Sequence, residues 1–250
     1  MSFKRSIRNY HRYLGLIIGI QFLFWTVGGL YFSWTSIDEI RGSNLKNQHA
    51  FFSKNLHIPD INPYLDSLNN IKSIDSIKEI EIRKIDDKPF IVLTYFSSDN
   101  ENSVERNLLI DIEKNELLDT ISAELAGRLA QKSMKNPVGI KKIDRIDKKD
   151  INNHHEYRGG IFPAYAVHLV TNGNLVIYVD ASNGEVLSYR SNKWRIFDFL
   201  WMMHTMDYAN RDNFNNWVLR IFAVLGLLTL FSGFILFFST AKWFRKKKSN

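Results

Sequence analysis

Two long apolar runs, one near each end of the 250-residue chain, restrict its fold more than any other feature. The first, Tyr13 to Trp34, carries no charge over 22 residues, and the second, Ile221 to Ala241, carries none over 21. A helix needs about 20 apolar residues to cross a hydrocarbon core about 30 Å thick. Both runs therefore predict transmembrane helices. The first also exceeds the roughly 7–15 apolar residues of a signal peptide and precedes no A-x-A-like site, so we expect an uncleaved anchor.

The net charge of +7 comes from the two ends of the chain. Residues 1–12 and 242–250 together hold nine Lys or Arg and no acid, whereas the rest of the chain holds 24 Lys or Arg against 26 Asp or Glu. Basic residues beside a membrane span mark its cytoplasmic side. The pattern predicts a bacterial inner-membrane protein with two cytoplasmic tails and an extracytoplasmic segment, residues 35–216. No basic patch outside the tails supports nucleic-acid binding.

The segment between the spans contains two stretches in the same register, "NLLIDIEKNELLDT" and "LVIYVDASNGEVLSY". Asp111 and Asp180 each precede a glutamate, Glu116 or Glu185, by the same interval. The two stretches are offset by 69 residues, which is longer than a short solenoid repeat. This length suggests two copies of a small domain. Both Asp–Glu pairs frame hairpin turns, so we assign them turn chemistry and no acid–base role.

The sequence around each stretch predicts a helix followed by an antiparallel sheet of about four strands. "NPYLDSLNNI" and "SAELAGRLAQKSM" are the helical candidates. Turn dipeptides separate the predicted strands at Asp86-Asp87, Asn172-Gly173 and Asn183-Gly184. Each copy therefore predicts an α+β unit.

This pattern, best matched by "VIYVDASNGEVLSY", resembles the PepSY domain. "YHRYLGLIIGIQFLFWTVGGLYFSW" and "WMMHTMDY" are similar to the helices of the PepSY-associated transmembrane family. The resemblance implies a division into seven parts. They are a basic tail (1–12), a first span (13–34), two PepSY-like repeats (35–121 and 122–192), an interfacial helix with a linker (193–216), a second span (217–241) and a basic tail (242–250).

The resemblance implies two functions. The first is a non-enzymatic binding or accessory module, with a protein partner or a second copy contacting the transmembrane helices. Larger relatives are ferric-siderophore reductases and haem-containing membrane proteins, which implies an alternative: a haem b electron-transfer subunit linked to iron or siderophore reduction. The chain has only two spans, and it lacks G-x-S-x-G, H-E-x-x-H, Walker A and G-x-G-x-x-G motifs, so no catalytic residue is predicted.

His204, in "FLWMMHTMDY", is the strongest cofactor candidate. At helical spacing Phe197, Trp201, His204 and Tyr208 share a face, which is typical of a short helix lying at the membrane surface. Alternatively, His204 is a haem ligand. His11 is a second candidate, but it is predicted about 30 Å away, at the other side of the bilayer, so the two histidines belong to separate sites.

Three further motifs have structural explanations. Met202, Met203 and Met206 with His204 are soft ligands for Cu(I), but only Met203 and Met206 share a helical face. His154-His155-Glu156 lacks the spacing of a helical zinc site and predicts a solvated loop, so no metal site is expected. Gly15 and Gly19 form a G-x-x-x-G motif, which favours close contact with the second span or with another protomer.

Overall fold

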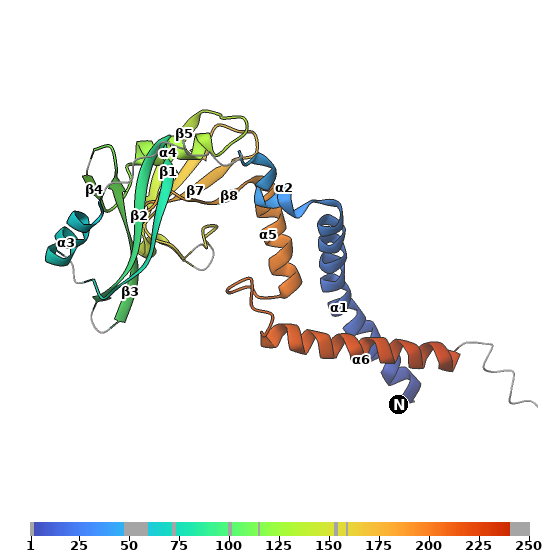
Figure 1. Cartoon of the computed structure of the whole chain (residues 1–250). Coiled ribbons are helices and arrows are strands. Elements are labelled where there is room, and N and C mark those ends of the chain that lie inside the picture. The colour runs from blue at the N-terminus through green and yellow to red at the C-terminus, as the bar shows by residue number, and fades with distance from the viewer. Residues whose placement is uncertain are drawn as a thin grey trace, which may run out of the picture. The chain divides into compact units, whose positions relative to one another are not determined.

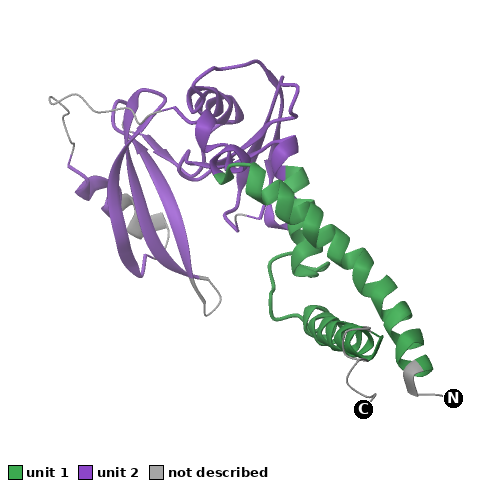
Figure 2. Cartoon of the chain, turned by 90° about the vertical axis from the view of Figure 1, so that its right-hand side faces the viewer, with its two compact units in different colours: residues 1–37, 195–250 green, residues 38–194 purple. Residues whose placement is uncertain are grey.

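The computed structural model describes residues 3–47, 60–71, 74–99, 102–114, 116–152, 155–158 and 160–240. The chain forms two compact units, one of residues 1–37 with 195–250 and the other of residues 38–194 (Figure 2). The first contains the two apolar helices and the second contains two four-stranded antiparallel sheets. The protein is therefore of the α+β class, as predicted.

The unit of residues 1–37 and 195–250 is built from α1 (Phe3–Trp34), most of α5 (Asn192–Thr205) and α6 (Trp217–Thr240). α1 and α6 are long and apolar enough to cross a membrane. α6 has no buried residue, so its apolar side chains face outward instead of into a protein core. α1 begins at Phe3, well before the predicted start at Tyr13, because the basic segment contains no Pro or Gly that would interrupt a helix.

α1 and α6 run in opposite directions and cross (Figure 1). His11, early in α1, places Nδ1 2.7 Å from the Oγ of Ser232, late in α6. Trp25, late in α1, has its ring centre 5.8 Å from that of Phe222, early in α6. A Cβ on Gly233 would lie 3.2 Å from His11, so this glycine permits the closest approach.

The G-x-x-x-G motif does not contact α6. A Cβ added to Gly15 or Gly19 would meet no described atom within 4 Å. The expectation that this motif packs against the second span is therefore wrong for the described part of the chain. The contacts between α1 and α6 are made by His11 and Trp25, which lie before and after the motif.

The first sheet follows α3 (Asn62–Ile71) and has the strand order β1-β2-β3-β4. Its strands are β1 (Ser76–Ile85), β2 (Lys88–Asp99), β3 (Asn102–Asp111) and β4 (Glu116–Leu118). The predicted turn at Asp86-Asp87 is confirmed, and both residues have positive φ, 51° and 68°. A two-residue hairpin requires this conformation because its twist then matches the twist of the strands.

The second sheet follows α4 (Ala123–Lys132) and has the order β5-β6-β7-β8. Its strands are β5 (Ile140–Ile146), β6 (Ala164–Leu169), β7 (Val176–Asp180) and β8 (Val186–Arg190). Short helices α2 (Ile37–Arg41), η1 (Ser43–Leu45) and η2 (Lys148–Asp150) complete the described elements. Gly184 has a φ of 73°, as its turn requires, whereas Asn174 rather than Gly173 takes positive φ between β6 and β7.

Asp111 and Asp180 occupy the same place in the two sheets, the last residue of the third strand. Both are buried, and each accepts a backbone N–H of the following turn through Oδ1, from Glu113 at 3.0 Å and from Ser182 at 2.7 Å. Burial raises the pKa of Asp180, and its hydrogen bonds oppose that increase. The shared sequence register therefore corresponds to the same kind of turn after the third strand of each sheet.

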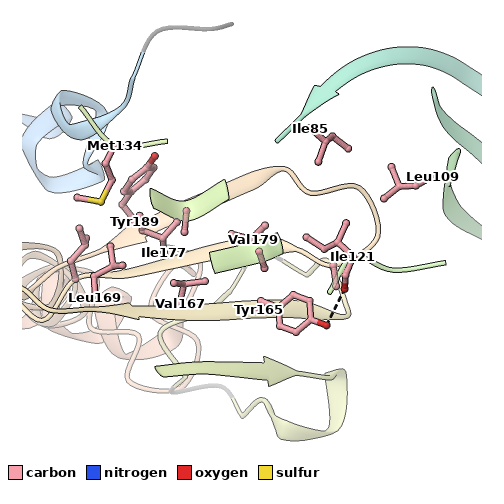
Figure 3. Close-up of a cluster of buried hydrophobic side chains, with 14 of the residues drawn as sticks. Ile85, Leu109, Ile121, Met134, Tyr165, Val167, Leu169, Ile177, Val179 and Tyr189 are labelled. Carbon is pink, nitrogen blue, oxygen red and sulfur yellow. Dashed lines mark hydrogen bonds between the residues drawn. The ribbon is translucent and has the colours of Figure 1, made fainter. Parts of the chain in front are cut away.

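One cluster of buried apolar side chains draws on both sheets (Figure 3). Ile85 and Leu109 come from the first sheet, and Val167, Ile177 and Val179 come from the second. The alanines of α4, Ala126 and Ala130, are completely buried in the same cluster. The two sheets therefore share one core cluster, in addition to a smaller cluster that belongs to each sheet alone.

Ion pairs join the first hairpin turn to α4. Arg128 Nε lies 2.7 Å from Asp86 Oδ2, and Lys132 Nζ lies 2.7 Å from Asp86 Oδ1 and 2.5 Å from Asp87 Oδ2. Burial alone would raise the pKa of Asp86, but hydrogen bonds from Lys132 and Arg128 outweigh it and lower that pKa. The hydrogen bond from Lys132 also lowers the pKa of Asp87.

These pairs predict an acid-sensitive contact. Because the pKa of Asp86 is lower in the folded state than its ordinary value of 3.8, the unfolded state binds protons first as the pH falls. The stabilisation is present above the ordinary pKa and is lost as the pH falls through the folded one. Asp86→Asn should cost about 1 kcal/mol or less at pH 7, since the partners are half-exposed, and progressively less as the pH falls below 3.8. Denaturant unfolding of the full chain in detergent measures this. The exposed Asp66→Asn is the control, and an Asp86→Asn cost independent of pH would contradict the prediction.

Candidate functional site

The predicted face of α5 packs against α1. The ring centre of Phe32 lies 5.0 Å from that of Phe197, 6.0 Å from Trp201 and 6.1 Å from His204. Trp25 lies 5.6 Å from His204. The spacing of Phe197, Trp201 and His204 thus produces one aromatic surface, which is covered by a second helix.

Tyr208 does not share this face. α5 ends at Thr205, and Met206 has a φ of 55°, which stops the helix. Tyr208 follows in an irregular segment and is exposed. The same helix end removes the geometry of the Cu(I) alternative, because Met206 no longer lies one helical turn after Met203.

The last four carbonyls of α5 each accept a side-chain hydrogen bond. Gln21 Nε2 donates to Met203 O at 2.6 Å, and Trp25 Nε1 donates to His204 O at 3.1 Å. The other two bonds come from Thr205 Oγ1 to Met202 O at 3.3 Å and from Asn216 Nδ2 to Thr205 O at 3.0 Å. The terminal carbonyls of a helix have no partner within it, so these donors replace water there.

Asp207 organises the segment between α5 and α6. Its carboxylate accepts the backbone N–H of Asn210 at 3.1 Å and of Asn213 at 2.9 Å. Burial acts to raise its pKa, but these backbone hydrogen bonds outweigh burial and lower it. The carboxylate shapes the turn. Among the described residues it accepts no hydrogen bond from the His204 imidazole, which a ligand-orienting role would require.

His204 and His11 lie far apart on α5 and α1. Among the described residues His204 Nδ1 is buried and has no hydrogen-bond partner, whereas His11 is paired with Ser232. Trp25, which touches His204, lies 14 residues from His11 on the same helix, about 21 Å at 1.5 Å per residue. One haem needs its axial ligands on opposite faces of a single porphyrin. The two histidines of one chain therefore do not fit a shared haem.

Other titratable side chains make structural contacts. His155 Nδ1 accepts the backbone N–H of Tyr157, and Glu156 accepts the hydroxyl of Tyr178 at 2.9 Å. His154 lies outside the described residues. His168 Nε2 lies 3.1 Å from Asp144, and burial lowers the pKa of this histidine. Among the described residues, no group of three His, Cys, Asp or Glu could hold a metal ion.

The unit of residues 38–194 carries a groove with a volume of about 860 Å³ where the first hairpin turn, the end of α4 and the β7–β8 turn meet. Its apolar lining comes from Leu129, Met134, Val186 and Tyr189, and charged side chains surround it. The charged residues are Lys46, Glu81, Arg83, Lys84, Asp86, Asp87, Lys132, Lys135 and Glu185. Sequence reasoning missed this groove because its residues come from four distant segments.

No protein family, characterised protein or solved structure matches this chain.

Proposed function

We propose that the protein is a membrane-anchored binding module of the bacterial inner membrane. Both ends are cytoplasmic, and residues 35–216 are a PepSY-like extracytoplasmic segment. The outward-facing apolar side chains of α6 and the basic tails support the anchor and its orientation. In this proposal α1 and α6 hold the α+β unit at the membrane, and that unit carries out the recognition.

The observation that carries the binding role is the groove of residues 38–194. Its volume of about 860 Å³ falls in the usual range of about 300–1,000 Å³ for ligand sites. It combines an apolar floor with a charged rim, where Lys46 lies 5.7 Å above the ring of Tyr189. This combination suits a polypeptide segment, whose apolar side chains fill the floor and whose polar groups meet the rim. The protein would then act as a non-enzymatic accessory subunit.

Photocrosslinking tests this assignment. A benzophenone side chain at Lys135, on the groove rim, should give one discrete crosslinked product in intact cells. Lys141 is the matched control because it is also an exposed lysine but lies outside the groove, on β5. Two differently tagged copies of the chain distinguish a homo-oligomer from a foreign partner. No product from Lys135, or equal products from both positions, would contradict the proposal.

A second candidate follows from the buried Nδ1 of His204, which has no hydrogen-bond partner in the described part of the chain and would bind iron once the neighbouring rings moved aside. A haem between two copies, with one His204 from each, would make the protein an electron-transfer subunit of a membrane reductase. The visible spectrum of protein purified from haem-replete cells separates the candidates. A Soret band lost in His204→Ala supports the second, and no band in the wild type excludes it for the purified chain.

A further inference from the structure

α5 follows α1 along its length instead of touching it at one point. Phe197 lies beside Phe32, and seven residues later His204 lies beside Trp25, which is seven residues earlier in α1. The contacts therefore advance by seven residues along α5 while they retreat by seven along α1, so the two helices pack side by side in antiparallel directions. A helix lying flat on the membrane would cross an upright α1 at a single place, so this contact does not fit the flat orientation predicted from the sequence.

The contact lies within the uncharged run of α1. The residues that face α5 are Gln21, Trp25, Gly28 and Phe32, a helical stripe. A Cβ on Gly28 would lie 3.9 Å from the Cβ of Leu200, an ordinary contact distance, so the two helices face each other directly at this position. If the bilayer-spanning segment were shifted towards the N-terminus to leave this stripe in water, Arg12 would enter the hydrocarbon, at a large cost in free energy.

The end of α5 does not need water. Bilayer hydrocarbon contains no water to pair with free carbonyls, so each must find a donor in the protein. All four terminal carbonyls of α5 have such donors, and two donors, Gln21 and Trp25, come from α1 itself. Gln21 is almost fully buried although it lies in the middle of an apolar run, and this role explains its position.

The other side of α5 is apolar and uncovered. Ile196 and Phe199 are half-exposed, and the neighbouring turns of α1 expose Leu23, Val27 and Leu30 to a similar extent. Asp198, the acid of this helix, is buried against Arg211, and residues 199–206 carry no formal charge. The exposed apolar surface of the two helices continues onto the lipid-facing surface proposed for α1.

We propose that the C-terminal half of α5 is immersed, upright beside α1, in the bilayer leaflet at the C-terminal end of α1, with Ile196 and Phe199 turned towards the lipid. The inference rests on the two-span anchor proposed above. Lipid is the occupant of this face because the uncovered side chains are apolar and the helix end is saturated with hydrogen bonds. After Met206 the polar turn folds back along α5 towards its N-terminal half, where Arg211 pairs with Asp198 and Asp212 accepts a hydrogen bond from Trp201. The carboxylate of Asp207 accepts backbone N–H groups of this turn.

Depth-resolved fluorescence quenching tests the inference. The chain has no cysteine, so single cysteines at positions 196, 199 and 203, which share one helical face, can each carry a fluorophore. The full chain is reconstituted in phosphatidylcholine vesicles that contain lipids spin-labelled near the headgroup or deep in the acyl chain. An upright helix predicts that the fluorophore lies about 10 Å deeper at position 203 than at position 196, from seven residues at 1.5 Å each. Equal depths would show a flat helix and overturn the inference.

Two control positions keep the outcomes separable. A fluorophore at Leu228, in the middle of α6, should be quenched by the deep label, and one at the exposed Val170 should be quenched by neither. No quenching at Leu228 would refute the anchor itself. Quenching at Leu228 without any at positions 196–203 would leave the anchor intact and show that protein or water, not lipid, covers α5.

Discussion

Leu109→Ala should lower the free energy of unfolding of the whole 38–194 unit by about 2–5 kcal/mol, in one cooperative transition. Leu109 belongs to the first sheet and is completely buried, yet its cluster contains Val167, Ile177 and Val179 of the second sheet. Removing its side chain leaves a cavity on a surface that both sheets share. A loss of packing in the first sheet therefore also weakens the contact that holds the second sheet against it.

Denaturant unfolding of the full chain in detergent, followed by circular dichroism, measures this effect. Val104→Ala is the matched control, because Val104 lies on the same strand but is 38% exposed, and it should change stability by less than about 0.5 kcal/mol. Two separate transitions, of which Leu109→Ala shifts only one, would show that the two sheets fold independently and would contradict the shared core.

Asp198→Ala should be the most damaging substitution in the helical unit, with a cost of about 3–5 kcal/mol. Asp198, on α5, forms an ion pair with Arg211 in the following turn, and both side chains are largely buried. Loss of the carboxylate leaves a buried guanidinium without its counter-ion. The turn before α6 should then detach from α5 and become accessible to protease.

The double variant Asp198→Leu with Arg211→Met removes both charges and keeps the volume, so it should recover most of the loss. Limited proteolysis and thermal unfolding in detergent compare the three proteins. The control is Asp66→Ala, a substitution of an exposed aspartate on α3. Asp212, which is also exposed, is unsuitable because it accepts a hydrogen bond from Trp201. A double variant as unstable as Asp198→Ala would show that the pair contributes something other than charge balance.

Local patterns predicted most of the secondary structure. The segment "NPYLDSLNNI" corresponds to α3 without any shift, and Asp86-Asp87 forms the turn that its composition indicates. These elements depend on neighbours close in sequence. The end of α5 was not predictable in this way, because the apolar pattern continues through Met206 while the backbone turns at that residue under the control of Asp207.

The candidate site was only partly visible in the sequence. The spacing of Phe197, Trp201 and His204 indicated a common face, but not that α1 covers it. Gln21 and Trp25 looked like ordinary members of an apolar run, whereas their side chains donate hydrogen bonds to carbonyls at the end of a helix that lies 182 and 179 residues further along the chain. No local signal identifies such donors, since their partners are main-chain atoms.

By itself the sequence determined the two apolar helices, the charge at the ends and the alternation of helix and hairpins, because each depends on composition and short-range periodicity. The tertiary structure decided that the two sheets share a core, that α1 and α6 meet at His11 and Gly233 rather than at the glycine motif, and that α5 stands beside α1. These three contacts form where two apolar surfaces exclude water from each other. Their residues lie far apart in the chain, so short-range patterns do not show which surfaces meet.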